Sequence, residues 1–94
     1  MAIERIHARV EGRVQGVGFR HFVWTQAQAL GLTGWVRNRR DGSVEVVAEG
    51  PAEALDVLVR ALHQGPPASR VKAVHVQRGP ATHEFLTFDI RPTV

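Results

Sequence analysis

The sequence predicts a small α+β fold whose elements follow the order strand, helix, strand, strand, helix, strand, with a short extra strand at the end. Two observations support this prediction. Apolar residues change from strand-like to helical spacing twice along the chain, and an Asp-Gly pair separates two strand-like runs. We expect a mostly antiparallel sheet with both helices on one of its faces.

The first strand and the first helix are predicted from the spacing of apolar residues. Residues 6–14, IHARVEGRV, alternate apolar and polar side chains, which is typical of a half-buried strand. From about His21 to Leu30 the apolar residues recur at helical spacing instead. Gly31 predicts the end of this helix, because glycine adopts the left-handed conformation that closes many helices.

The middle of the chain predicts a hairpin and a second helix. GWVRNRR and SVEVVAE flank Asp41-Gly42, and we expect both turn residues to have positive φ, as in a two-residue hairpin. Pro51 suits the first turn of the next helix, and Gly65 with two following prolines ends it. The apolar stripe of this helix consists of Leu55, Leu58, Val59 and Leu62.

The segments RVKAVHVQ and FLTFDIRP predict the last two strands. The complete order corresponds to the split β-α-β-β-α-β plan of ferredoxin-like sandwiches. No linker, low-complexity tract or repeat interrupts it, so we expect residues 1–94 to form a single domain. Because this fold hosts many unrelated functions, it does not identify an activity by itself.

Composition limits the class of protein. A hydrophobic fraction of 44% supports a globular core, and no apolar run is long enough to span a membrane. The charged N-terminal stretch MAIERIHARV is unlike a signal peptide, and the chain has no cysteine for disulfides. We therefore expect a cytoplasmic monomer without a membrane partner. The net charge of +3 suits an anionic ligand but does not require nucleic acid.

The stretch GRVQGVGFRHF contains the first functional signal. Gly16 and Gly18 lie where the first strand gives way to the first helix, and glycine lets backbone N–H groups approach a ligand closely. The free N–H groups of a helix N-terminus favour an anion. Arg20 adds a planar, forked donor that matches two phosphate oxygens. The coincidence of these features favours a phosphate-binding loop over a plain turn.

Other phosphate-binding motifs fit this loop poorly. A nucleotide-binding P-loop requires Lys and then Ser or Thr after its second glycine, whereas Phe19 and Arg20 follow Gly18. A dinucleotide-binding loop requires a third glycine at the position of His21. A cysteine phosphatase has its cysteine six residues before the arginine, and Val14 stands there. Any reaction on the bound phosphate must therefore use water or another nucleophile.

The second functional signal is RNRR, residues 37–40. Asn38 is the only asparagine in the chain and lies within a predicted strand, where asparagine is disfavoured. From the residue type alone, a hairpin residue near the turn is the simpler interpretation. The functional interpretation is an amide beside the phosphate loop that exchanges hydrogen bonds with a water. The neighbouring Arg37, Arg39 and Arg40 are expected to form a solvated strand end that attracts anions.

Together these stretches resemble the acylphosphatase family. VEGRVQGVGFRHFV and LTGWVRNRRDGSVEVVAEG carry the resemblance, GPP in GPPASRVKAVHV supports it, and it covers essentially the whole chain. It implies hydrolysis of acyl phosphates to a carboxylate and inorganic phosphate. It also implies that Arg20 binds the phosphate and that Asn38 positions the attacking water. The implied phosphate-binding loop consists of Gln15, Gly16, Val17, Gly18, Phe19 and Arg20.

The chemistry of acyl phosphates explains why so few groups suffice. The leaving carboxylate is a weak base of pKa about 4, so no general acid is needed. The loose transition state places charge on the phosphoryl oxygens, which positioned donors can neutralise. Asn38 would supply proximity rather than basicity. The scheme uses no metal and no other cofactor.

Other candidates receive structural interpretations. The five histidines lack the His-x-x-x-His spacing of many metal sites, and Trp24 and Trp35 are expected in the core or at its rim. The alternative function is RNA binding, which requires aromatic residues on the central strands, and ARVEGRV and SVEVVAE have none. The resemblance leaves a third possibility, in which the chemistry is the same but the context differs. Similar domains occur within larger proteins that handle carbamoyl phosphate. We expect no nucleic-acid partner.

Overall fold

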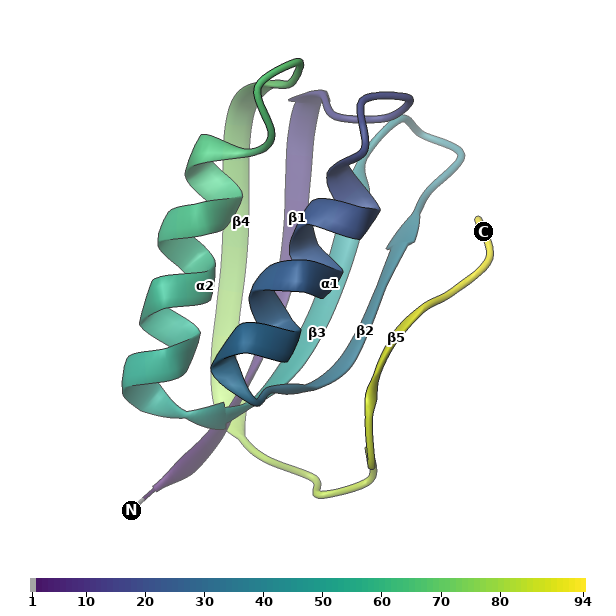
Figure 1. Cartoon of the computed structure of the whole chain (residues 1–94). Coiled ribbons are helices and arrows are strands. Elements are labelled where there is room, and N and C mark those ends of the chain that lie inside the picture. The colour runs from purple at the N-terminus through teal and green to yellow at the C-terminus, as the bar shows by residue number, and fades with distance from the viewer. Residues whose placement is uncertain (1) are drawn as a thin grey trace.

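The computed structural model describes residues 2–94 and has the α+β, ferredoxin-like fold that the sequence predicts (Figure 1). The elements are β1 (Ile3–Arg13), α1 (Phe19–Leu30), β2 (Thr33–Asn38), β3 (Val44–Pro51), α2 (Ala52–Gln64), β4 (Arg70–Pro80) and β5 (Phe88–Ile90). The five strands form one sheet in the order β4-β1-β3-β2-β5. Every pair is antiparallel except β2 with β5, which is parallel.

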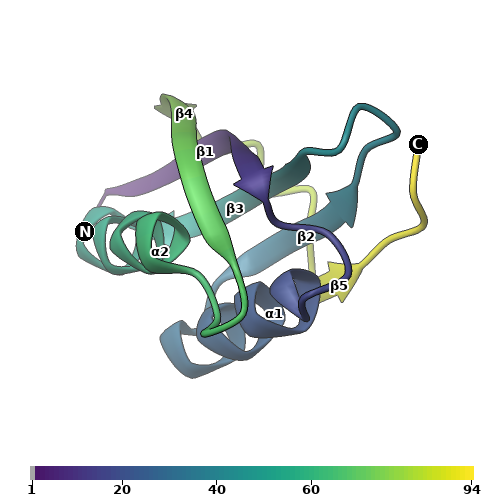
Figure 2. The same ribbon diagram turned by 90° about the horizontal axis from the view of Figure 1, so that it is seen from above.

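Both helices cover the same face of the sheet, as Figure 2 shows from above. The core fills the space between these two layers, because the alternating apolar residues of the strands face the helices. Its fully buried members include Ile6, Ala8, Val10, Val36, Val44, Val46 and Ala48 from the sheet and Val23, Ala27, Leu55, Leu58 and Leu62 from the helices. Within residues 2–94, no helix has the length and apolar character needed to cross a membrane.

Two helix boundaries differ from the sequence prediction. Helix α1 begins at Phe19 rather than about His21, because the Gly18 carbonyl already accepts the first helical hydrogen bond, from the Phe22 N–H at 3.0 Å. The prediction that Pro51 lies in the first turn of α2 is wrong. Its ψ of 145° is extended, so Pro51 still pairs with β1 and serves as the N-cap of α2.

The turn and the last strand also differ in detail. Only Gly42 in the β2–β3 turn has positive φ, at 94°, so the expectation for Asp41 is wrong. The Gly42 N–H donates to the Arg39 carbonyl at 3.1 Å, which closes a turn one residue longer than the predicted two-residue hairpin. Strand β5 covers only Phe88–Ile90, a shorter span than the predicted FLTFDIRP.

The face of the sheet opposite the helices carries a buried carboxylate. Glu45 on β3 is 7% exposed, and it accepts hydrogen bonds from Arg37 Nε at 2.8 Å and Arg39 Nη1 at 3.2 Å. Its second oxygen lies 2.6 Å from His7 Nε2. The expectation of a solvated strand end therefore holds only in part, because Arg37 and Arg39 are partly exposed and both are paired with Glu45. Of the three arginines, only Arg40 is exposed.

A second buried carboxylate on this face fixes the chain before β5. Glu49 is 4% exposed and accepts hydrogen bonds from the backbone N–H groups of Thr82 at 2.8 Å and His83 at 2.9 Å. Burial alone would raise the pKa of Glu49, but these hydrogen bonds outweigh burial and lower it. Glu49 thereby anchors the segment that leads from β4 to the edge strand β5.

The environment of Glu45 predicts a specific loss of stability in acid. Burial alone would raise its pKa, but the hydrogen bonds from His7, Arg37 and Arg39 lower it from 4.5 to about 2. A folded-state pKa below the unfolded value stabilises the fold above pH 4.5, and this contribution disappears as the pH falls toward 2. We expect Glu45→Gln to lower the free energy of unfolding at pH 7 by up to about 3 kcal/mol.

Urea denaturation of both proteins between pH 7 and pH 2 checks this prediction. The difference between wild type and Glu45→Gln should be constant above pH 5 and should shrink below it. A difference that stays the same down to pH 2 would contradict the assigned role of the Glu45 charge.

Candidate active site

The described residues form an open pocket of about 250 Å³ where the loop after β1 meets the end of β2. Figure 1 shows this loop and the β2–β3 turn at the same end of the molecule. The lining residues are Val14, Gly16, Gly18, Phe19, Arg20, His21, Asn38 and Ile90. Arg20 and Asn38, which are 18 positions apart in sequence, thus share one pocket with the glycine loop.

The two glycines of the loop adopt a backbone conformation that other residues rarely reach. Gly16 has φ 72° and Gly18 has φ 79°, both in the left-handed region. A Cβ on either residue would meet no atom within 4 Å, so crowding by the protein does not explain the glycines. They allow the chain to curl after β1, and they leave open space on the pocket side of the loop.

Helix α1 begins at the pocket with free backbone donors. Gly18 is its N-cap, no side chain caps it, and its first turn contains no acidic residue. The first N–H groups of a helix have no partner within the helix, and the helix dipole makes this end partly positive. The pocket therefore presents backbone N–H groups and a favourable field to an anion.

Arg20 supplies the only permanent charge among the described residues that line the pocket, and no carboxylate lines it. Its side chain is half-buried in the first turn of α1. Within residues 2–94 it makes no hydrogen bond or ion pair, whereas Arg5, Arg37, Arg39 and Arg78 are all paired with carboxylates. A guanidinium in this state is available for a bidentate contact with an anion.

Asn38 is the last residue of β2, and its side chain lies on the helix-covered face. Val36, two residues earlier, is fully buried in the core, and strand side chains two residues apart share a face. The Asn38 backbone pairs with Val44 of β3, and its carbonyl accepts the Val94 N–H at 3.2 Å. No hydrogen bond within the described residues occupies the Asn38 side chain, which leaves its amide free.

The side chain of Gln15 connects the loop to the β2–β3 turn. Its Nε2 donates to the carbonyl oxygens of Arg39 at 2.6 Å and Ser43 at 2.8 Å. Both hydrogens of the amide are thereby used, so this nitrogen is not a donor to a ligand. Gln15 instead fixes the distance between the loop and the strand end that carries Asn38.

The structure brings together most of the residues predicted for the site. Gly16, Gly18, Phe19, Arg20 and Asn38 line the pocket, although the Phe19 side chain is only 2% exposed and packs in the core. Gln15 and Val17 belong to the loop but do not line the pocket.

Sequence reasoning missed Ile90 and gave His21 no role. Its position directly after Arg20 could have indicated that His21 lies at the pocket. Ile90 reaches the pocket only because β5 pairs with β2, and no local pattern in the sequence indicates that pairing.

The described residues contain no group of three or more His, Cys, Asp or Glu side chains arranged to hold a metal ion.

Comparisons with known proteins identify the family of the chain. The acylphosphatase family model matches residues 6–90. The chain is 50% identical over 88 residues to an acylphosphatase of Salinibacter ruber, covering 94% of this chain and 93% of the relative. It superposes with a TM-score of 0.91 on the crystal structure of acylphosphatase from Bacillus subtilis, at 43% identity and covering 94% and 98% of the two chains.

A third similar structure is a much longer protein. Full-length HypF, in a phosphate- and nucleotide-bound form, aligns with a TM-score of 0.87 and 30% identity. The alignment covers 97% of this chain but only 12% of HypF. The family match and the relatives of nearly equal length show that the chain belongs to the acylphosphatase family and is a hydrolase of acyl phosphates.

Proposed function

We propose that the pocket hydrolyses acyl phosphates by direct attack of a positioned water. The observation that carries this proposal is the convergence of Arg20, the glycine loop and Asn38 on one pocket. Arg20 and the loop amides bind the phosphoryl group, and Asn38 holds the water. The products are a carboxylate and inorganic phosphate, and the substrates are small acyl phosphates.

The phosphoryl group occupies the space beside Gly16 and Gly18. Backbone N–H groups of residues 15–20 and the first turn of α1 donate to its oxygens, and the guanidinium of Arg20 contributes a forked pair of donors. In the loose transition state negative charge spreads over these oxygens. Donors that are already in place neutralise that charge without reorganisation, which lowers the barrier.

Asn38 acts on the nucleophile. Its free side-chain amide can accept a hydrogen bond from a water and donate one to a water. A water held in this way attacks in an effectively unimolecular step. The P–O bond to the acyl group breaks, and its electron pair leaves on the carboxylate, which needs no proton because its pKa is about 4. The attacking water loses its proton to solvent.

The open face of the sheet is unsuited to RNA. Its one tryptophan, Trp35, is 8% exposed and lies between Arg37, 4.5 Å from the ring centroid, and Arg91, at 5.2 Å. RNA-binding sheets of this fold instead stack bases on exposed aromatic rings. The absence of a nucleic-acid partner, the cytoplasmic location, the monomeric state and the single-domain organisation of residues 1–94 stay predictions.

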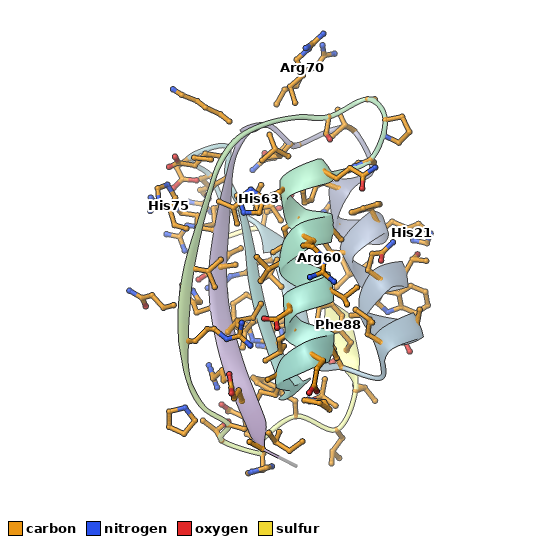
Figure 3. The ribbon with its side chains drawn as sticks, turned by 90° about the vertical axis from the view of Figure 1, so that its left-hand side faces the viewer. His21, Arg60, His63, Arg70, His75 and Phe88 are labelled. Atoms are coloured by element: carbon orange, nitrogen blue, oxygen red, sulfur yellow. The ribbon has the colours of Figure 1, made fainter. Side chains whose placement is uncertain are left out.

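Replacing Arg20 by lysine tests the phosphate contact. We expect Arg20→Lys to raise KM for acetyl phosphate about tenfold or more, because lysine keeps the charge but loses the planar fork. Steady-state kinetics measure the change. Arg60→Lys is the matched control, because Arg60 is exposed on α2 (Figure 3) and does not line the pocket. Near wild-type KM and kcat in Arg20→Lys would remove Arg20 from the mechanism.

Replacing Asn38 by alanine tests the role assigned to the water. We expect kcat to fall by roughly 10²- to 10³-fold, the size seen when one positioned catalytic donor is removed. The inhibition constant of inorganic phosphate should change less than about threefold, because Asn38 is not the main phosphate contact. Gln77→Ala removes an exposed amide from β4 as a control. Weaker phosphate binding with normal turnover would show that Asn38 is misassigned.

A further inference from the structure

The pocket has a side that the phosphate chemistry does not use. Gly16, Gly18, Arg20 and Asn38 account for the phosphoryl group and the water. Of the remaining lining residues, Val14 and Phe19 are 1% and 2% exposed and form the floor. The side chains left at the mouth are those of Ile90 and His21, both of which are exposed.

Ile90 is held beside the end of β2. It pairs with Val36 in the parallel β2–β5 ladder, and the Arg91 N–H donates to the Val36 carbonyl at 2.9 Å. Phe88, on the same face of β5, is 2% exposed in the core, which shows that this face points toward the helices. Ile90 is nevertheless 43% exposed, because it lies where the pocket opens rather than under α1.

His21 forms the opposite rim from α1. Its ring is stacked on Trp24, with the centroids 5.9 Å apart and the planes inclined by 18°. Trp24 Nε1 donates to the Phe88 carbonyl at 3.1 Å, which ties this aromatic pair to β5. Figure 3 shows His21 projecting from the solvent side of α1 and Phe88 lying behind the helices. This hydrogen bond thus joins helix α1, which carries His21, directly to strand β5, which carries Ile90.

We propose that Ile90 and His21 form a binding subsite for the acyl group and give the enzyme a preference for aromatic or extended apolar acyl phosphates. This inference rests on the proposed function, because it places the phosphoryl group in the loop. The acyl group of a substrate bound in the loop would extend toward the mouth, where these two side chains lie. Ile90 offers aliphatic surface and the His21 ring offers a flat face for stacking, and both are suited to an apolar group.

The test compares benzoyl phosphate with acetyl phosphate in wild type, His21→Ala and Ile90→Ala. The measured quantity is kcat/KM for benzoyl phosphate divided by kcat/KM for acetyl phosphate. Dividing the ratio of each variant by that of wild type cancels the intrinsic reactivity of the two substrates. We expect this double ratio to fall roughly 3- to 10-fold in each variant, as for the loss of a small apolar contact.

Matched controls separate the subsite from general effects. His63→Ala and Leu86→Ala remove an exposed histidine and an exposed leucine that do not line the pocket, and both should keep the wild-type ratio. His21→Phe retains a ring and should restore the ratio that His21→Ala loses. The inhibition constant of inorganic phosphate should stay within about twofold of wild type in every variant, which verifies that the loop is intact.

Each outcome decides one question. A double ratio between about 0.5 and 2 means that the substrate preference is essentially unchanged. If one alanine variant shows this, the contact assigned to that residue is wrong. If both variants show it, the proposed subsite is wrong. If wild type hydrolyses both substrates and the variants keep its substrate ratio, the subsite fails but the proposed function stands. If wild type hydrolysed neither substrate, the proposed function would fail, and the subsite would fail with it.

Discussion

The pair of hydrogen bonds from Gln15 to the β2–β3 turn is the contact on which the active site depends. The loop after β1 and the end of β2 belong to strands that are not neighbours, because β3 lies between them. A side chain that bridges this gap helps to fix Arg20 relative to Asn38. Gln15 does so by donating to two carbonyls that flank the turn, at 2.6 and 2.8 Å. Its amide is used for structure, and we propose that the backbone of the loop binds the ligand.

The turn that Gln15 holds is itself stabilised from within. Asp41 Oδ1 accepts the Ser43 N–H at 2.9 Å and the Ser43 hydroxyl at 2.6 Å. These hydrogen bonds, first among them that of the hydroxyl, lower the pKa of Asp41 and favour its ionised form. On the open face, Arg37 and Arg39, which lie on either side of Asn38, are both paired with Glu45. Neighbouring cations are thereby held on the other face of the sheet, and Arg20 is left as the cation of the pocket.

The sequence was sufficient for the fold because its signals are local. Alternation in β1, the helical period of α1 and the turn at Asp41-Gly42 each act over a few residues. The loop residues and Asn38 were predicted in part from backbone chemistry and in part from resemblance to a family. The function of Gln15, the burial of Glu45 and the arrival of Ile90 at the pocket could not be predicted. Each depends on a contact between residues far apart in sequence, and no periodicity encodes such a contact.

We propose that the loop binds phosphate rather than merely turning the chain. The most direct test of this proposal is thermal unfolding of wild type and Arg20→Gln with phosphate titrated against chloride at constant ionic strength. Phosphate bound only to the folded state adds about 2.7 kcal/mol at one hundred times Kd. In a domain of this size, 1 kcal/mol raises Tm by roughly 4–8 °C. We expect a large rise in Tm for wild type and a much smaller one for Arg20→Gln. Equal rises in the two proteins would contradict the proposal, because a nonspecific salt effect does not need Arg20.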